Sequence, residues 1–501
     1  MGRGGSADII HPWEVLDHWA SRELPEWSAN WKTTAPRVCL AKLVSGRDIE
    51  DVNSYLRKAR PVAGAGSSWL FHRGDHDFSL VPLTIILFLF GDREGVLYPK
   101  TREHLLRHLL TLSGPRGNLK VPYTLGMFRE TENHILMMEG SRYLKDRWLS
   151  IHRRKEGRSD LERQGSWLSG FLKEKARKGL EEFNSQPYIG FTLTILLALS
   201  AFGGREVSRK ARGLLDVLNR TYALSSISFR RYPPFNRRRD HAGKGWVDKD
   251  PHTSMMKVWA LRAGLDPGCL PYRGGFKHAL MAYVLPYDLP DDVKGLLTGD
   301  AGRHLVFMGH GRSRSPEICS RGPGYLITAG GARCRRITDE VVRPITVMFD
   351  DGARHLDGIV HLGMRDRFPV RPNNTGVFHR FAVSNGPVHV PKGFKEIDRN
   401  GPWALYKHSR MDVCVHSTEE LGIVALLGHD SPAIDLEDIT RRNNDPKELS
   451  ERFIFPDGTV VRYEPKARPG TYVIKDNDLW PGGRYTDKWP PLTIVQVPDG
   501  R

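Results

Sequence analysis

Stretches of helical length alternate between two kinds from about His11 to His304, and this alternation restricts the fold more than any other feature of the chain. In one kind nearly every residue is apolar, and in the other the apolar residues lie on one side of the helix. A helix that is apolar all round is buried on all sides, whereas a striped helix lies at the surface. The all-apolar stretches begin near Val81, Asn133, Pro187 and His252, and the striped ones are Thr101–Leu112, Trp167–Glu182 and Arg205–Leu224. The alternation predicts an incomplete two-layer ring of helical hairpins, an α/α toroid, over residues 11–304.

The pattern changes in the second half of the chain, where the apolar segments become short and rich in β-branched residues. Turn sequences such as Asp350-Asp351-Gly352 and Pro456-Asp457-Gly458 separate them. The segments are GYLITAGG from Gly324, VVRPITVMF from Val341, MDVCVHS from Met411, GIVALLG from Gly422, TVVRYEP from Thr459 and LTIVQV from Leu492. They predict an antiparallel β-sandwich over residues 305–501, so the expected fold is multidomain, α and then β.

The charge balance favours a negatively charged partner. The 501 residues include 75 Lys and Arg against 58 Asp and Glu, a formal net charge of +17. Such a surface attracts polyanions, although an arginine-rich proteome produces the same excess without any function. The five cysteines are scattered without a Cys-x-x-Cys pair, which excludes a disulfide framework and a cysteine zinc site.

Neither the interior nor the start of the chain predicts a membrane protein. The most apolar stretches, VPLTIILFLF and FTLTILLALSAF, are shorter than the roughly 18–20 residues that cross a bilayer. The N-terminus lacks the basic and then apolar pattern of a signal peptide. We therefore expect a cytoplasmic protein without a membrane partner, or an extracytoplasmic one if a leader is missing from this chain.

The predicted ring brings four loops to one end. Consecutive helices of hairpins are antiparallel, so every buried helix runs in the same direction and their N-termini meet. Helix N-termini offer free N–H groups and a positive dipole end, which suit an anionic ligand. The loops at this end hold mostly polar or ionisable residues: His72, His76 and Asp77; Arg129 to His134; Asn184 to Tyr188; and Arg237, Arg238, Arg239, His241 and Trp246.

The polar residues of these loops can also be explained without a binding or catalytic role. Thr131 and the Asn184-Ser185 pair are competent helix caps, and an arginine run is commonly a solvated surface. A metal site on His72, His76 and Asp77 lacks a clear third histidine, so no metal is expected. No phosphate-binding loop follows a strand, and we expect no cofactor.

Three short strings resemble a known group of proteins: Thr131-Glu132-Asn133-His134, Asn184 to Tyr188, and Tyr232 to Arg239. They look like bacterial toroid proteins of uncharacterised activity. In fold they resemble the heparinase II/III, alginate and hyaluronate lyase group, which pairs an α/α toroid with β-sandwich material. The resemblance implies cleavage of a uronate-containing acidic polysaccharide by β-elimination.

The resemblance also implies roles for individual residues. Asn133 would neutralise the substrate carboxylate, His134 would be the base, and Tyr188 would be the acid, or base and acid both. Arg238 would hold the uronate. The helix dipole should disfavour the imidazolium form of His134 and keep this base neutral. The further residues expected to bind substrate are Arg129, Glu132, Asn184, Arg237, Arg239, His241, Trp246 and His76.

Two other functions remain open on the sequence. One is a non-catalytic toroid that only binds a glycan or polyanion. The other is a glycoside hydrolase with paired carboxylates, for which Glu132 and either Glu182 or Asp240 are candidates. No nucleic-acid recognition motif is present, so an acidic polysaccharide or oligosaccharide is the expected partner. The oligomeric state is not predicted.

Overall fold

The structure, a computed structural model, describes residues 11–61, 75–111, 129–153, 158–186, 188–233, 247–268, 276–299, 302–311, 315–330, 345–362, 376–428, 435–464, 474 and 492–496. The chain forms two compact units. The first comprises Met1–Ala176, Pro187–Asn219 and Pro251–Pro290, and the second comprises Arg177–Gln186, Arg220–Asp250 and Asp291–Arg501. The predicted domains, 11–304 and 305–501, follow the change of secondary structure and stay a prediction.

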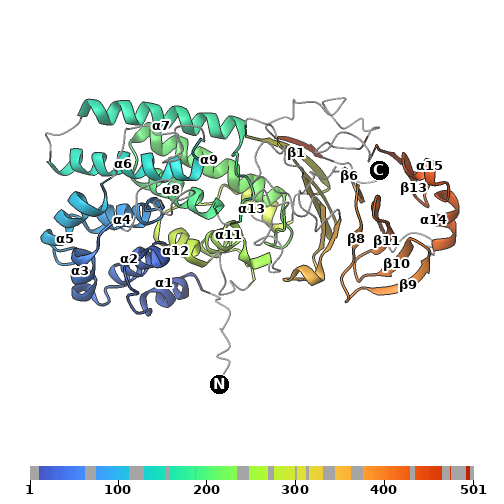
Figure 1. The fold of residues 1–501 in the computed structure, drawn as a ribbon, viewed down its shortest axis with the longest axis horizontal. Coiled ribbons are helices and arrows are strands. Elements are labelled where there is room, and N and C mark those ends of the chain that lie inside the picture. Colours follow the sequence, from blue (N-terminus) through green and yellow to red (C-terminus); the bar gives the residue numbers. More distant parts are fainter. Residues whose placement is uncertain are drawn as a thin grey trace, which may run out of the picture. The chain divides into compact units, whose positions relative to one another are not determined.

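Helices precede strands along the chain, as predicted (Figure 1). The helices of the first part are α1 (Pro12–Ala20), α2 (Ala35–Ser45), α3 (Ile49–Lys58), α4 (Asp77–Phe90), α5 (Pro99–His104), α6 (Glu132–Arg153), α7 (Arg158–Lys178), α8 (Ile189–Phe202), α9 (Arg205–Leu224), α11 (Pro251–Arg262), α12 (Phe276–Val284) and α13 (Asp291–Thr298). Within the described part of the chain, none of these helices combines the length and the apolar character needed to cross a membrane.

The helices expected to be buried are buried. In α4 every residue from Asp77 to Leu87 is inaccessible to solvent or nearly so, and in α8 the same holds from Ile189 to Leu199. The N-terminal halves of α6 and α11 are equally enclosed. Helix α2 belongs with them, since Ala35–Leu43 is buried, although the sequence pattern did not single it out.

The N-terminal ends of several buried helices meet. Phe78 in the first turn of α4 packs on Phe191 in the first turn of α8, with ring centroids 4.4 Å apart. Phe191 also meets His278, near the start of α12, edge to face at 4.7 Å. At the opposite ends of α4 and α8, Phe88 stacks on Phe202 at 4.6 Å. Helices α4 and α8 therefore run in the same direction, as predicted for two buried helices of the ring.

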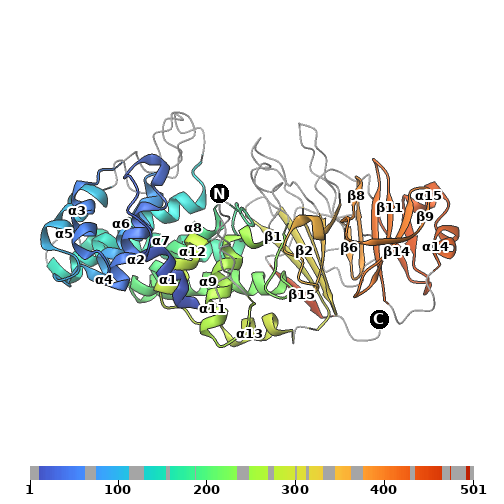
Figure 2. The same ribbon diagram turned by 90° about the horizontal axis from the view of Figure 1, so that it is seen from below.

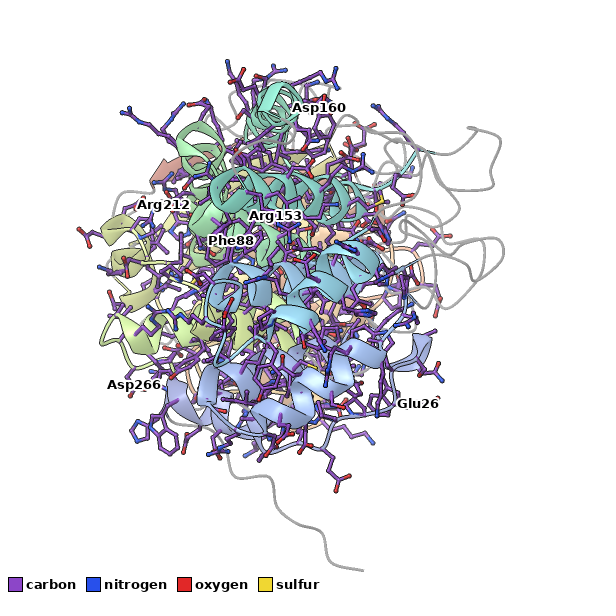
Figure 3. All side chains as sticks on the ribbon, turned by 90° about the vertical axis from the view of Figure 1, so that its left-hand side faces the viewer. Glu26, Phe88, Arg153, Asp160, Arg212 and Asp266 are labelled. Carbon is purple, nitrogen blue, oxygen red and sulfur yellow. The ribbon has the colours of Figure 1, made fainter. Side chains whose placement is uncertain are left out.

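At least one surface helix, α7, runs in the opposite direction to its buried neighbour. Helix α7 is antiparallel to α6, because Gln164 bonds Asp146 at one end and Lys175 lies 3.9 Å from Glu132 at the other. Helices α1, α2 and α12 are neighbours, as both ribbon views show (Figures 1 and 2). Figure 3 looks onto the side where α4 and α6 end, marked by Phe88 and Arg153.

The second unit contains antiparallel sheets. One sheet has the order β15-β1-β2-β3-β4-β5-β8, a second has the order β6-β7-β12-β11-β10-β9, and β13 pairs with β14. The strands are β1 (His304–His310), β2 (Ser315–Gly322), β3 (Tyr325–Gly330), β4 (Ile345–Phe349), β5 (Val360–Leu362), β6 (Gly376–Phe378), β7 (Phe381–Ser384), β8 (Val388–His389), β9 (Lys395–Asn400), β10 (Trp403–Lys407), β11 (Asp412–Ser417), β12 (Gly422–Leu427), β13 (Arg452–Ile454), β14 (Val460–Arg462) and β15 (Thr493–Gln496). Two short helices, α14 (Leu436–Arg442) and α15 (Pro446–Leu449), lie between β12 and β13.

Each face of the larger sheet has its own core. One face contributes side chains such as Leu305 and Phe307 to an apolar cluster that also contains residues of the second sheet. The other face, which includes Val306, packs on residues from the end of α9 and the segment after it. The hydroxyls of Thr328 and Thr346 on adjacent strands both donate to the carbonyl oxygen of Tyr232, at 3.0 and 2.7 Å. Residues 224–232 are thus an integral cover of the sheet.

Candidate functional site

The first turn of α6 buries Asn133 and His134 side by side in the helical unit. Asn133 is 1% exposed and His134 is 5% exposed. The Thr131 hydroxyl donates to the Asn133 side-chain oxygen, which fixes the amide with its nitrogen facing away. That nitrogen, Nδ2, is buried and has no hydrogen-bond partner within the described residues. A buried amide donor without an acceptor is costly, so the position favours a ligand that supplies one.

His134 forms an ion pair with Asp77, the first residue of α4. His134 Nδ1 donates to Asp77 Oδ2 at 2.6 Å, and the Asp77 carboxylate is completely buried. Burial lowers the pKa of His134, but the charge and hydrogen bond of Asp77 outweigh it and raise the pKa to about 9. The expectation that His134 is neutral is therefore wrong. The helix dipole acts against the imidazolium, but a carboxylate at hydrogen-bond distance is the stronger influence.

Asp75, Asp77 and His134 are close enough to share a metal ion. Their ligand atoms lie within 4.8 Å of one another. However, Lys32 Nζ lies 2.6 Å from Asp75 Oδ2, and His134 already pairs with Asp77. The two carboxylates are thus each paired with a cation of the protein, as in a structural ion-pair network.

Three further predicted residues lie near the starts of α4 and α6. His76 precedes α4, and its Nε2 donates to the Leu109 carbonyl oxygen at 3.0 Å. Burial lowers the pKa of His76, so this imidazole is neutral. Glu132 is buried with Lys175 3.9 Å away, which offsets part of the negative charge beside Asn133. Arg129 is half-buried just before α6.

Tyr188 immediately precedes the first turn of α8 and is half-buried. The expected first helical residue, Pro187, lies outside the described residues. Tyr188 is one turn before Phe191, whose ring contacts Phe78, and Phe78 in turn meets His134 edge to face at 5.3 Å. Tyr188, Asn133 and His134 are therefore at the same end of the buried helices.

Asn184 lies in the other compact unit, in a buried polar network. Its Nδ2 donates to Glu317 Oε1 at 2.7 Å, and Arg231 donates to its side-chain oxygen. Glu317 also accepts from His310 Nε2 at 2.7 Å. Burial raises the pKa of Glu317, but the bond from His310 and the charge of Arg231 lower it to about 2. This arrangement accounts for Asn184 without any substrate.

The basic loop that was expected to bind the uronate is not part of the described chain. Arg237, Arg238, Arg239, His241 and Trp246 all lie outside the described residues, as do His72 and Asp240.

Two cations that the sequence analysis missed, Arg37 and Lys277, lie at the starts of α2 and α12. Arg37 is fully buried in the first turn of α2, and its Nε donates to the Lys277 carbonyl oxygen at 3.3 Å. The available signal was an arginine at the third position of a mostly apolar segment, residues 35–43, within helix α2. It was overlooked because Arg37 and Lys42 interrupt the apolar run.

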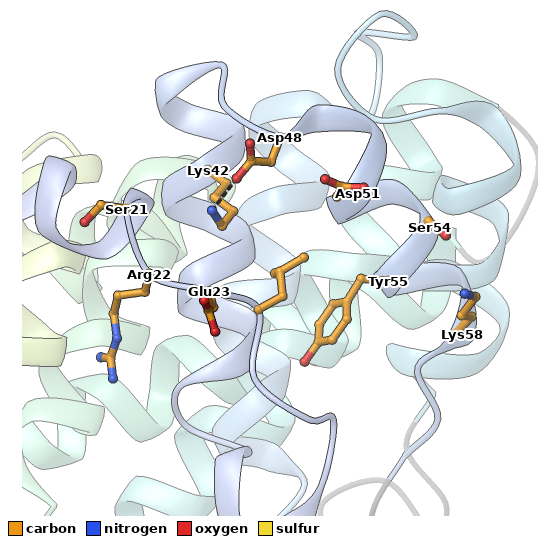
Figure 4. Close-up of a pocket in the computed structure, with 10 residues that line it drawn as sticks. Ser21, Arg22, Glu23, Lys42, Asp48, Asp51, Ser54, Tyr55 and Lys58 are labelled. Atoms are coloured by element: carbon orange, nitrogen blue, oxygen red, sulfur yellow. Dashed lines mark hydrogen bonds and ion pairs between the residues drawn. The ribbon is translucent and has the colours of Figure 1, made fainter.

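A cavity of about 500 Å³ lies between α1, α2 and α3 (Figure 4). Several of its polar side chains bind one another or the backbone. Lys42 Nζ, for example, donates to the Ala20 carbonyl oxygen at 2.9 Å and to Asp48, and the Tyr55 hydroxyl donates to the Pro25 carbonyl oxygen. Of the predicted site residues that the structure describes, none lines this cavity.

Comparisons with known proteins add no family. No protein-family model matches the chain, and no curated protein matches its sequence.

Proposed function

We propose that the chain is a polysaccharide lyase that cleaves a uronate-containing acidic polysaccharide by β-elimination. In this proposal the helical unit is an incomplete α/α toroid and the second unit is a β-sandwich. The observation that carries it is the first turn of α6. There the residue with a buried amide nitrogen that has no protein partner among the described residues, Asn133, directly precedes a buried imidazolium, His134.

The chemistry of β-elimination needs such a pair of donors. The C5 proton of a uronate is hardly acidic while the adjacent carboxylate carries its full charge. Donors fixed around that carboxylate stabilise the enolate as it develops, without any reorganisation in the transition state. Asn133 and His134 are the second and third residues of α6, so the helix dipole adds to their effect.

A cationic His134 changes the division of roles. A protonated imidazole cannot accept the C5 proton, so the base must be another group. We assign both proton transfers to Tyr188, which takes the C5 proton as a phenolate. The electrons of the C5–H bond form the C4=C5 double bond, the C4–O bond breaks, and Tyr188 returns the proton to the leaving oxygen. His134 and Asn133 then serve as charge stabilisers.

The test is a panel of uronate polymers followed by the ultraviolet absorbance of unsaturated sugar ends. Wild type should generate this absorbance on at least one polymer, and Tyr188→Phe should abolish it while leaving polymer binding and the fold intact. Tyr98→Phe is the matched control, because Tyr98 precedes α5 as Tyr188 precedes α8. Full activity of Tyr188→Phe on a cleaved polymer would refute the assignment.

Asn133→Ala tests the charge-stabilising role. We expect a loss of about 10²–10³-fold in turnover, the usual effect of removing an oxyanion donor. Thr131→Val keeps the shape of the neighbour but removes the hydroxyl that orients the amide, so it should produce a smaller loss. If new reducing ends appear without ultraviolet absorbance, the protein is a hydrolase. If the polymer binds and neither product forms, the protein is a glycan-binding protein.

A further inference from the structure

Arg37 carries a buried charge that the described part of the protein does not compensate. Its Nη1 donates to the Thr33 carbonyl oxygen at 2.6 Å and its Nε to the Lys277 carbonyl oxygen at 3.3 Å. Both acceptors are neutral. Nη2 is buried and has no partner within the described residues. Burial alone lowers the pKa of Arg37 to about 9. A guanidinium enclosed in this way is costly unless an anion joins it.

A second cation, Lys277, contacts the same aromatic ring as Arg37, that of Phe191. Its Nζ is 4.7 Å from the centre of the Phe191 ring, and the guanidinium carbon of Arg37 is 5.5 Å from the same centre. Burial and the charge of Arg37 lower the pKa of Lys277 to about 8. Among the described residues, no carboxylate forms an ion pair with either side chain. The pair therefore has two positive charges and no counterion in that part of the chain.

In the same compact unit, the charged cluster of Asp75, Asp77 and His134 contains charges that are paired. There Lys32 faces Asp75 and His134 faces Asp77, one cation for each carboxylate. His278, next to Lys277, adds no negative charge. Its pKa is lowered well below the usual value by burial and by the charges of Lys277 and Arg37, so it is neutral, and its Nε2 is buried without a described partner. The Arg37–Lys277 pair differs from these two ion pairs because neither of its cations has a carboxylate partner within the described residues.

The local backbone also favours an anion. Arg37 is in the first turn of α2 and Lys277 in the first turn of α12, and the free N–H groups and positive dipole ends of two helices meet there. We propose that Arg37 and Lys277 form a binding site for an oxyanion, a carboxylate or a sulfate. The inference that an anion binds here rests on these uncompensated charges and on the two helix starts. That it belongs to an acidic sugar of the polymer rests on the proposed function.

The experiment uses the full-length protein and measures binding by calorimetry, with thermal unfolding in parallel. Sodium sulfate and sodium glucuronate are titrated at constant ionic strength, at pH 7 and at pH 9.5. Wild type should bind at pH 7 and should gain melting temperature from the anion. Binding should weaken at least tenfold at pH 9.5, because Lys277 loses its proton as the pH rises through about 8.

Lys277→Met is the variant, since methionine keeps an apolar stem beside Phe191 and removes the charge. It should fold with unchanged or higher melting temperature in anion-free buffer and lose at least tenfold in affinity. Lys173→Met on the exposed side of α7 is the control and should bind as wild type does. Equal affinity of wild type and Lys277→Met, or no binding of either anion by wild type, would overturn the proposal.

The two anions and the polymer assay separate this proposal from the lyase assignment. Sulfate binding that depends on Lys277, in a protein that cleaves no polymer, supports the site and refutes the lyase. Polymer cleavage that is insensitive to Lys277→Met, with no anion binding, supports the lyase and refutes the site. Preference for glucuronate over sulfate would identify the acidic sugar as the source of the anion.

Discussion

Asp77 and His134 are 57 residues apart in the sequence and 2.6 Å apart in the structure. The proton that they share makes the stability of the helical unit depend on pH. The pKa of His134 is about 9 in the folded protein, against an ordinary value of 6.5. The stabilisation from this pair is therefore complete below about pH 6.5 and is lost as the pH rises through about 9.

Asp77→Asn tests this dependence. The variant should be less stable than wild type by on the order of 3 kcal/mol near pH 6.5, and the difference should shrink towards pH 9.5. Urea unfolding at both pH values measures it. Asp17→Asn is a control with the same chemical change, because Asp17 pairs with Arg47 where both side chains are about half exposed. A difference that does not change with pH would mean that His134 is neutral in the folded protein.

At the scale of single elements, the close approach of α8 to its neighbours depends on Gly190. A Cβ atom at this position would lie 2.5 Å from His278 and 2.6 Å from Pro251, the first residue of α11. All these groups are buried, so neither neighbour can withdraw towards solvent. Glycine is needed here for space, because its backbone is that of an ordinary helix.

Gly190→Ala should therefore destabilise the protein by about 1–3 kcal/mol, the usual cost of overpacking. Gly213→Ala is the contrasting variant. Gly213 lies on the exposed side of α9, and a methyl group added there would meet nothing within 4 Å, so alanine should stabilise the helix by up to about 1 kcal/mol. Thermal unfolding of both variants gives the comparison, and equal effects of the two substitutions would contradict this account of the packing.

Individual elements also show how far the sequence can predict this fold. Helices α4 and α8 were recognised because burial on every side leaves no polar positions to obscure the pattern. Strand β9 was missed because all of its residues, Lys395–Asn400, are exposed, so no alternation of buried and exposed positions marks it.

Asn133, His134 and Tyr188 were placed at one end of the buried helices by topology alone. The pairing of His134 with Asp77 and of Arg37 with Lys277 was not foreseen, because contacts between charges across the fold leave no local pattern.

At the scale of the whole molecule, the two compact units are interleaved along the chain. A cut at the predicted boundary, residue 304, separates the larger sheet from the residues that cover one of its faces. That face includes Val306, Met308, Leu326 and Met348, and its cover includes Leu224, Ile227, Tyr232 and Val247. Large apolar faces without a cover lead to association.

We therefore expect a fragment of residues 305–501 to aggregate or to bind a hydrophobic dye strongly. A fragment of residues 220–501 retains the covering segment and should bind less dye at the same concentration. Size-exclusion chromatography and dye fluorescence distinguish them. A monomeric 305–501 fragment with low dye binding would show that the cover is dispensable.

The pairing of β1 with β15 bears on the order in which the sheet can form. Val306 of β1 lies opposite Ile494 of β15, so the edge of the larger sheet is completed by a segment made long after β1 itself. Closing so large a loop costs entropy that is recovered only when the strands meet, and contacts of such long range slow folding. Until then β1 presents an unpaired edge to other chains. The newly synthesised protein is thus most vulnerable to edge-to-edge aggregation in the interval between the synthesis of β1 and the arrival of β15.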